Sequence, residues 1–134
     1  MRGIDNLNVQ PNSIKKFVRH VLGCTCPDKV FERIEDRRVQ PSDSPHTRAI
    51  TVGGRLLIYI WQVEGSGDLS QGVSSMLAAG KEERDARGLN RFRAVLATYN
   101  PQTVQLQADF CFSRFKGSDD RMHLHVVSAD ELDF

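Results

Sequence analysis

Residues 48–63 most strongly limit how this chain can fold. Their sequence, RAITVGGRLLIYIWQV, has two runs rich in β-forming residues on either side of Gly53-Gly54. Adjacent glycines readily adopt the positive φ angles of a tight turn, so the stretch predicts a β-hairpin. Every position from Leu56 to Trp61 is apolar, which makes both faces of the second strand apolar. Such a strand is typical of a sheet that is covered by other layers on both sides.

The chain after the hairpin alternates between helical and strand patterns. Apolar residues at helical spacing predict a helix that has Asp68 as its N-cap and stops at Gly88, followed by the strand RFRAVLATY. Residues 103–115 fit either an alternating strand or one helical face, and we favour the helix because Asn100-Pro101 is a helix-start pattern. A last strand, MHLHVV, follows at residues 122–127. Strands separated by helices with short connections predict parallel pairing.

The N-terminal part is expected to be helical. Apolar residues at positions i, i+3, i+4, i+7 and i+8 predict a helix from Ser13 to Leu22. Pro27 fits the start of a second helix, which would bury Val30, Phe31 and Ile34 and leave the charged run ERIEDRR mostly in water.

These patterns together predict one α/β domain over residues 1–134. It comprises a helical N-terminal part (13–38), a Pro- and Ser-rich loop (39–47) and a sheet-forming part (48–134). The expected sheet is mixed but mostly parallel, has about four strands and is flanked by helices.

Composition excludes several classes of function. The 134 residues are 40% hydrophobic and 26% charged, as in ordinary globular proteins, and the formal net charge of +1 provides no general field for nucleic acid or an anionic membrane. The first residues lack the apolar core of a signal peptide, so we expect a cytoplasmic protein. No Ser/His/Asp, GxSxG, HExxH or P-loop pattern supports a hydrolase or a nucleotide-hydrolysing enzyme, and the sequence leaves open whether the protein is an enzyme at all.

The stretch LGCTCPDKVF carries the first candidate site, because Cys24 and Cys26 are one residue apart just before an expected helix. A thiol beside a helix N-terminus is favoured as a thiolate and can act as a redox centre or a metal ligand. A disulfide across one residue closes a small strained ring, which suits a reversible switch better than a brace. The alternative is that both cysteines are small residues that fill a tight corner.

A metal site would need further ligands, because zinc or an iron–sulfur cluster normally has four. His123 and His125 lie two residues apart on the last strand and therefore share one of its faces. His20 precedes Cys24 by about one helical turn. These three histidines are the candidates to complete a metal site with Cys24 and Cys26.

The most polar stretch, residues 81–93, is the second candidate site. Mixed charges at helical spacing usually form a solvated helix end. Arg91 and Arg93 share one face of the following strand with Asn90 beside them, so they could clamp a carboxylate or a phosphate. They lie at the N-terminal end of a strand, however, whereas open α/β sheets usually bind ligands at the carboxyl ends. The alternative function is therefore a non-catalytic interaction module that binds a protein partner, or a second copy of the chain, through Arg84, Arg91 and Arg93.

Two further features are weaker candidates. Cys111 lies between two phenylalanines, where a free cysteine usually acts as a small core residue. The loop 64–68 is rich in glycine and lies between a strand and a helix, but it lacks the GxGxxG spacing and carries two carboxylates, so it predicts a turn and not a nucleotide site. The leading hypothesis is thus metal binding or reversible thiol redox chemistry at Cys24 and Cys26.

Overall fold

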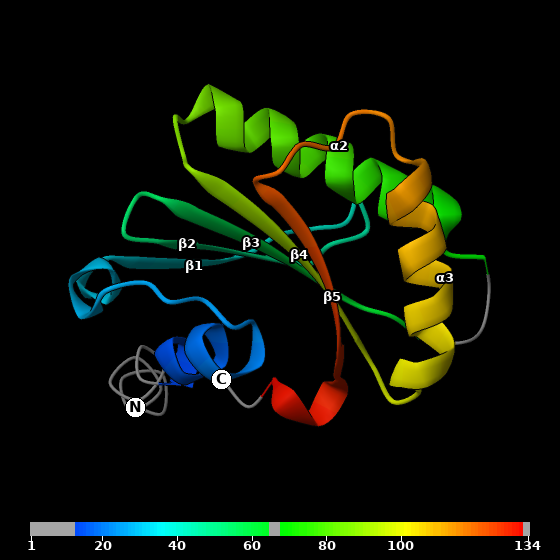
Figure 1. The fold of residues 1–134 in the computed structure, drawn as a ribbon, viewed down its shortest axis with the longest axis horizontal. Coiled ribbons are helices and arrows are strands. Elements are labelled where there is room, and N and C mark those ends of the chain that lie inside the picture. Colours follow the sequence, from blue (N-terminus) through cyan, green and yellow to red (C-terminus); the bar gives the residue numbers. More distant parts are fainter. Residues whose placement is uncertain (1–12, 65–67, 133–134) are drawn as a thin grey trace.

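The computed structural model describes residues 13–64 and 68–132, which form one mixed five-stranded sheet packed against helices (Figure 1). The elements are η1 (Phe17–Val21), η2 (Asp28–Glu32), β1 (Ile34–Arg38), β2 (Arg48–Val52), β3 (Leu56–Gln62), α2 (Ser70–Ala86), β4 (Arg91–Thr98), α3 (Pro101–Arg114), β5 (Met122–Ser128) and η3 (Ala129–Glu131). Figure 1 shows α2 and α3 over one face of the sheet and the N-terminal helical segment on the other.

The strands lie side by side in chain order, β1-β2-β3-β4-β5. The pairs β1–β2 and β2–β3 are antiparallel, and the pairs β3–β4 and β4–β5 are parallel. The α/β class and the parallel second half are as the sequence predicts. The prediction of a mostly parallel, four-stranded sheet is wrong, because the sheet has a fifth strand, β1, that adds a second antiparallel pair.

Strand β1 replaces the second half of the expected N-terminal helix pair. The predicted second helix is reduced to the 3-10 turn η2, and Ile34–Arg38 runs antiparallel to β2 as an edge strand. The sequence of β1 lacks the apolar alternation of a half-buried strand, because its inward-facing residue Asp36 is charged. Arg48 of β2 pairs with Asp36 and donates to both carboxylate oxygens at 2.8 and 2.6 Å. A charge that points inward from an edge strand is one way in which natural sheets prevent edge-to-edge association.

The first predicted helix is present. Residues 13–16 are α-helical and continue into the π turn η1, with Ile14, Phe17 and Val18 buried against the sheet. The helix ends near Gly23, whose φ of 74° places it in the left-handed region, as a helix stop commonly requires.

The central hairpin is confirmed, but its turn is longer than a two-residue connection. Gly53 and Gly54 have φ values of 63° and 65°, and the last pair of the ladder is Val52–Leu56. Arg55 therefore belongs to the connection and not to the strand. Its carbonyl accepts hydrogen bonds from the backbone amides of Asn90 (2.7 Å) and Arg91 (3.1 Å), which ties the hairpin tip to the start of β4.

Helices α2 and α3 form the crossovers between the three parallel strands. Residues 103–115 are helical up to Arg114, so the favoured choice for this segment is confirmed. Helix α2 approaches the sheet closely at Gly80, where a Cβ atom would lie 2.1 Å from the buried ring of Phe92.

Two apolar clusters occupy opposite faces of the sheet. One lies between the sheet and the helices α2 and α3, and it includes Leu57 and Tyr59. The other lies between the sheet and residues 14–31, and it includes Ile58 and Ile60. The apolar alternation of β3 thus predicts correctly that both faces of this strand are covered. Within the described ranges, no helix is long and apolar enough to cross a membrane.

Candidate functional site

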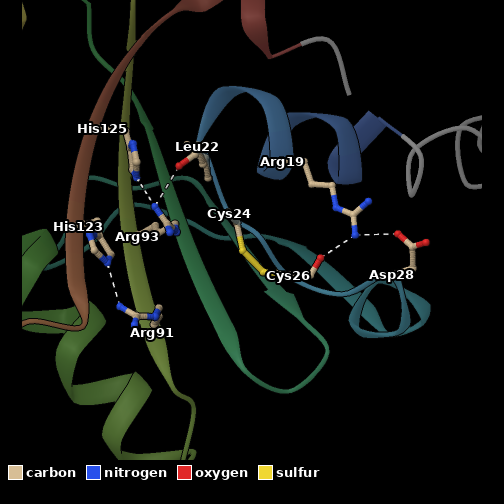
Figure 2. The surroundings of a disulfide bond; sticks show 9 residues. All are labelled: Arg19, Leu22, Cys24, Cys26, Asp28, Arg91, Arg93, His123 and His125. Carbon is tan, nitrogen blue, oxygen red and sulfur yellow. Dashed lines mark hydrogen bonds and ion pairs between the residues drawn. A yellow bond between two sulfur atoms is a disulfide. The ribbon is translucent and has the colours of Figure 1, made fainter.

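The cysteine turn connects η1 to η2, and Cys24 and Cys26 form a disulfide across it (Figure 2). The two Cα atoms are 5.5 Å apart. The backbone amide of Cys24 donates to the carbonyl of Val18 at 3.1 Å, which fixes the turn to the preceding helix. Both cysteines are half-buried, and both pack against the edge of the apolar cluster on this face of the sheet.

Arg19 holds the other end of the turn. Its guanidinium donates to the carbonyl of Cys26 at 2.6 Å and pairs with Asp28 at 2.7 Å, while Lys15 pairs with the same carboxylate at 3.1 Å. Hydrogen bonds from Lys15 and Arg19 lower the pKa of Asp28, which therefore stays charged and compensated. Its negative charge is thus directed to these two cations and not to the sulfur atoms.

A pocket of about 200 Å³ brings the two candidate sites of the sequence together. The cysteine turn forms one wall, and the hairpin tip with the start of β4 forms the other. The lining residues are Cys24, Thr25, Cys26, Pro27, Val30, Val52, Arg55, Leu56, Asn90, Arg91 and Arg93. The pocket lies at the N-terminal end of β4, which is not the usual ligand-binding edge of a parallel sheet. The antiparallel hairpin β2–β3 and the cysteine turn build a separate site at this edge.

Arg93 stands at the centre of this arrangement. Its Nη1 atom donates to the carbonyl of Leu22 at 3.2 Å and contacts Nε2 of His125 at 2.9 Å (Figure 2). Its Nε atom is buried and has no hydrogen-bond partner among the residues that the structure describes. Arg91 repeats the pattern, because its Nη1 atom lies 3.2 Å from Nε2 of His123. Burial and the charge of Arg91 lower the pKa of Arg93. The pocket wall therefore carries positive charge, and the described residues that line it include no acidic one.

His123 and His125 share a face of β5, as predicted, but they contact arginines. Burial, followed by the charges of Arg93 and His123, lowers the pKa of His125 to about 4. Burial and both arginines lower the pKa of His123 as well. Both rings are thus neutral near pH 7, so each Nε2 atom can accept a hydrogen bond from its arginine.

The metal hypothesis has no structural support. No group of three His, Cys, Asp or Glu side chains gathers as a metal site within residues 13–64 and 68–132. The arginines lie where a cation would have to approach His123 and His125, and like charges repel at such distances. His20 lines a different pocket, together with Asp130 and Glu131. Zinc or an iron–sulfur cluster therefore has no ligand set in the described part of the chain.

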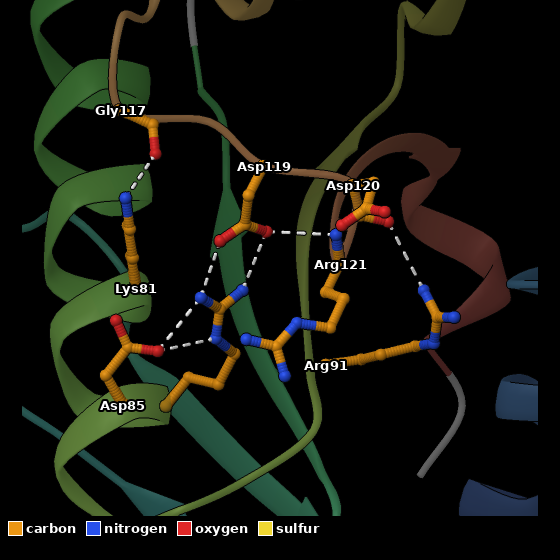
Figure 3. Close-up of polar contacts among 8 residues, drawn as sticks. Lys81, Asp85, Arg91, Gly117, Asp119, Asp120 and Arg121 are labelled. Atoms are coloured by element: carbon orange, nitrogen blue, oxygen red, sulfur yellow. Dashed lines mark hydrogen bonds and ion pairs between the residues drawn. The ribbon is translucent and has the colours of Figure 1, made fainter.

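Arg84 lies inside the molecule and not on the predicted interaction surface. Figure 3 shows Asp85 and Asp119, which are its carboxylate partners, beside Lys81 and Gly117. Arg84 is 1% exposed, and its Nη2 atom bonds Asp119 at 2.6 Å and Asp85 at 2.9 Å. Hydrogen bonds from Arg84 lower the pKa of Asp119 to about 2. Beside it, Lys81 donates to the carbonyl of Gly117 at 2.7 Å. These contacts attach the segment before β5 to α2. Protein binding through the exposed part of residues 81–93 stays a prediction.

The weaker candidates of the sequence acquire no site geometry. Cys111 is a free, half-buried cysteine at the edge of the cluster under α3, and burial raises its pKa. Residues 65–67 of the glycine-rich loop lie outside the described residues. Asp68 accepts a hydrogen bond from the backbone amide of Ser70 at 2.9 Å, so it contributes to the start of α2, although Leu69 and not Asp68 is the N-cap of this helix.

Sequence reasoning missed Arg55 and Arg19 as parts of the site. Arg55 directly follows Gly53-Gly54. The local signal that could have drawn attention to it is its place as the third residue of the hairpin connection. Arg19 lies in a helix among other basic residues, so its contact with Cys26 depends on how the turn folds back.

Comparison of the chain with protein-family models, curated proteins and solved structures finds no match.

Proposed function

We propose that the protein performs reversible thiol–disulfide chemistry at Cys24 and Cys26. The observation that carries this proposal is the position of the disulfide: it forms the wall of a pocket whose opposite side presents arginines. A bond in such a place is accessible to a small molecule, and the cations beside it favour the thiolate that exchange chemistry requires.

A role as a structural brace is less consistent with the contacts around the bond. Loop-closure entropy assigns a disulfide that closes a three-residue loop about 1.6 kcal/mol, against about 3 kcal/mol for a fifteen-residue loop. The turn is already fixed without it, because Val18 binds the amide of Cys24 and Arg19 binds the carbonyl of Cys26. The fold therefore gains little from this bond.

Reduction needs an external thiol as the electron donor. A thiolate of the donor attacks one cysteine sulfur, the Cys24–Cys26 bond breaks, and its electron pair leaves with the other sulfur. A second donor thiol then attacks the mixed disulfide and is released as the oxidised donor. Overall, Cys24 and Cys26 gain two electrons and two protons, and two donor thiols lose them.

The test is a redox titration of the folded protein. Samples are equilibrated with mixtures of reduced and oxidised dithiothreitol, alkylated and analysed by mass spectrometry, while circular dichroism reports the fold. We expect full reversal with a retained fold and a midpoint above about −300 mV, the level below which structural disulfides typically lie.

The matched control is Cys24→Ser, which cannot form the internal disulfide. Its Cys26 should be alkylated without any dependence on the dithiothreitol ratio. The proposal fails if the wild-type bond resists reduction until the chain unfolds, or if reduction itself abolishes the folded spectrum.

A further inference from the structure

We propose that the pocket selects a small thiol that carries a carboxylate, with Arg55, Arg91 and Arg93 attracting the carboxylate while the thiol meets the Cys24–Cys26 bond. This inference rests on the proposed redox function and adds the class of substrate. It depends on three properties of the pocket that the described residues give it: its positive charge, its size and its apolar lining.

The charge of the pocket is positive, because the described residues that line it include three arginines and no acidic residue. Other arginines, such as Arg37, Arg48 and Arg87, pair with carboxylates in the structure. By contrast, the described residues provide no carboxylate partner for Arg91 or Arg93, which instead contact neutral histidines and backbone carbonyls. A bound anion would supply the missing negative charge.

Arginine nitrogens remain for a ligand to use. Both contacts of Arg91 within the described chain involve its Nη1 atom, so Nη2 and Nε are not taken by them. A guanidinium has five N–H donors arranged to bind a carboxylate through two parallel hydrogen bonds. Arg55 is an exposed residue on the hairpin tip and lines the same pocket.

The size and lining of the pocket limit the ligand. Its volume of about 200 Å³ is below the ~300–1,000 Å³ of sites for drug-sized molecules, so it fits a small compound or one end of a larger one. Val30, Val52 and Leu56 provide apolar surface for the carbon atoms that join a thiol to a carboxylate. The disulfide at the wall then selects for sulfur among small carboxylates.

The reaction is thiol exchange with a carboxylate-bearing donor. The donor thiolate attacks one sulfur of the Cys24–Cys26 bond, and the electrons of that bond leave with the second sulfur. A second donor molecule resolves the mixed disulfide, so that two donor thiols become one donor disulfide and the protein becomes a dithiol.

The experiment compares three small thiols of similar size and different charge: 3-mercaptopropionate, 2-mercaptoethanol and cysteamine. Rate constants for reduction of the protein disulfide are divided by those for reduction of hydroxyethyl disulfide, which corrects for intrinsic thiol reactivity. We expect 3-mercaptopropionate to be favoured over cysteamine by about tenfold or more, because fields of this kind raise encounter rates by ~10- to 1,000-fold. The preference should shrink in high salt.

Two variants distinguish the effect of the positive charge in the pocket from the effect of positive charge elsewhere on the surface. In the double variant Arg55→Gln/Arg91→Gln, the ratio of the normalised rate constants for 3-mercaptopropionate and cysteamine should fall to near one. Arg114→Gln removes an exposed positive charge from α3, on the other side of the sheet, and should keep the preference. Arg93 is left in place because it holds Leu22 and His125.

The outcomes distinguish this inference from the function on which it rests. Equal normalised rates for all three thiols would overturn the choice of an anionic donor and leave reversible redox chemistry intact. Loss of the preference in Arg114→Gln would assign it to general surface charge and would also overturn it. Failure of every thiol to reduce the folded protein would reject both proposals.

Discussion

The positively charged side chain of Arg93 contacts neutral groups. A guanidinium beside a neutral imidazole and a backbone carbonyl keeps its charge available to a ligand, whereas a carboxylate partner would neutralise it. This arrangement requires His125 to stay unprotonated, because a proton on its ring would place two cations about 3 Å apart.

Acidification should therefore destabilise the protein through His125. Its folded pKa of about 4 lies below the ordinary value of 6.5, so between these values the unfolded chain binds a proton that the folded chain does not. The His125 contribution is complete above pH 6.5, and it is lost as the pH falls toward 4, by up to roughly tenfold in the unfolding constant per pH unit. His125→Gln, which still offers an oxygen to Arg93, should flatten this slope in urea unfolding measured from pH 7 to 4.

The control for this measurement is His20→Gln, since His20 is exposed on η1. Burial also lowers the pKa values of His46 and His123, so part of the slope should remain in His125→Gln. An unchanged slope in His125→Gln would show that His125 is not kept neutral by the fold.

Alternation along β4 and β5 predicts which residues share a face, and the contacts of Arg91, Arg93, His123 and His125 agree with it. The partners themselves could not be predicted, because they depend on the register between the two strands. Arg84 shows the same limit: a helical charge pattern predicts exposure, whereas its burial depends on Asp119, which lies 35 residues further along the chain.

At the scale of the elements, a buried ion pair joins the edge strand β1 to β2. Asp36 and Arg48 have side chains that are only 16% and 6% exposed, and two hydrogen bonds join them across β1 and β2. Removing one member of such a pair leaves the other charge buried without this partner, which costs about 3–5 kcal/mol.

Asp36→Ala should lower the free energy of unfolding by about 3 kcal/mol in urea denaturation, the lower end of that range, because the carboxylate keeps some contact with solvent. Glu35→Ala is the matched control on the same strand. Its carboxylate pairs with Arg87 at 3.1 Å but is 57% exposed, and such surface pairs contribute about 1 kcal/mol or less. Equal losses for the two variants would mean that Asp36 does not anchor β1.

The element that sequence reasoning missed is this same strand. Strands with apolar alternation or continuous apolar runs, such as β3 and β4, are predictable because the apolar residues within the strand itself indicate that it is buried. One inward position of β1 is occupied by the carboxylate of Asp36, which is acceptable only because Arg48 of β2 pairs with it. A pattern within Ile34–Arg38 therefore could not reveal the strand, and the charged run resembled a solvated helix.

For the whole molecule, the sheet separates two cores that serve different purposes. Helices α2 and α3 pack on one face, with the Arg84–Asp119 contact attaching α2 to the segment before β5. The cysteine turn and η1 pack on the other face, which carries the pocket. The sequence predicts that both faces are covered, but the meeting of residues 24–27 with residues 90–93 depends on the hairpin tip and could be seen only in the structure.

This separation of the two cores predicts which residues exchange their amide hydrogens faster when the disulfide is absent. Hydrogen exchange should become faster in residues 17–28 of the Cys24→Ser/Cys26→Ser variant, because the amide of Cys24 and the end of η1 lose a constraint. Exchange in α2 and α3 should stay as in the oxidised wild type, since these helices pack against the cluster on the opposite face. Mass spectrometry of peptides after deuteration measures both regions in one experiment.

Cys111→Ser is the control, because Cys111 lies on α3 and packs against the other cluster. Any change that it causes should appear in peptides from α3 and not in residues 17–28. Faster exchange across all five strands in the double variant would mean that the disulfide supports the whole fold. Local exchange limited to the turn would mean that the sheet is a fixed support, on which the Cys24–Cys26 bond can open and close beside its arginines.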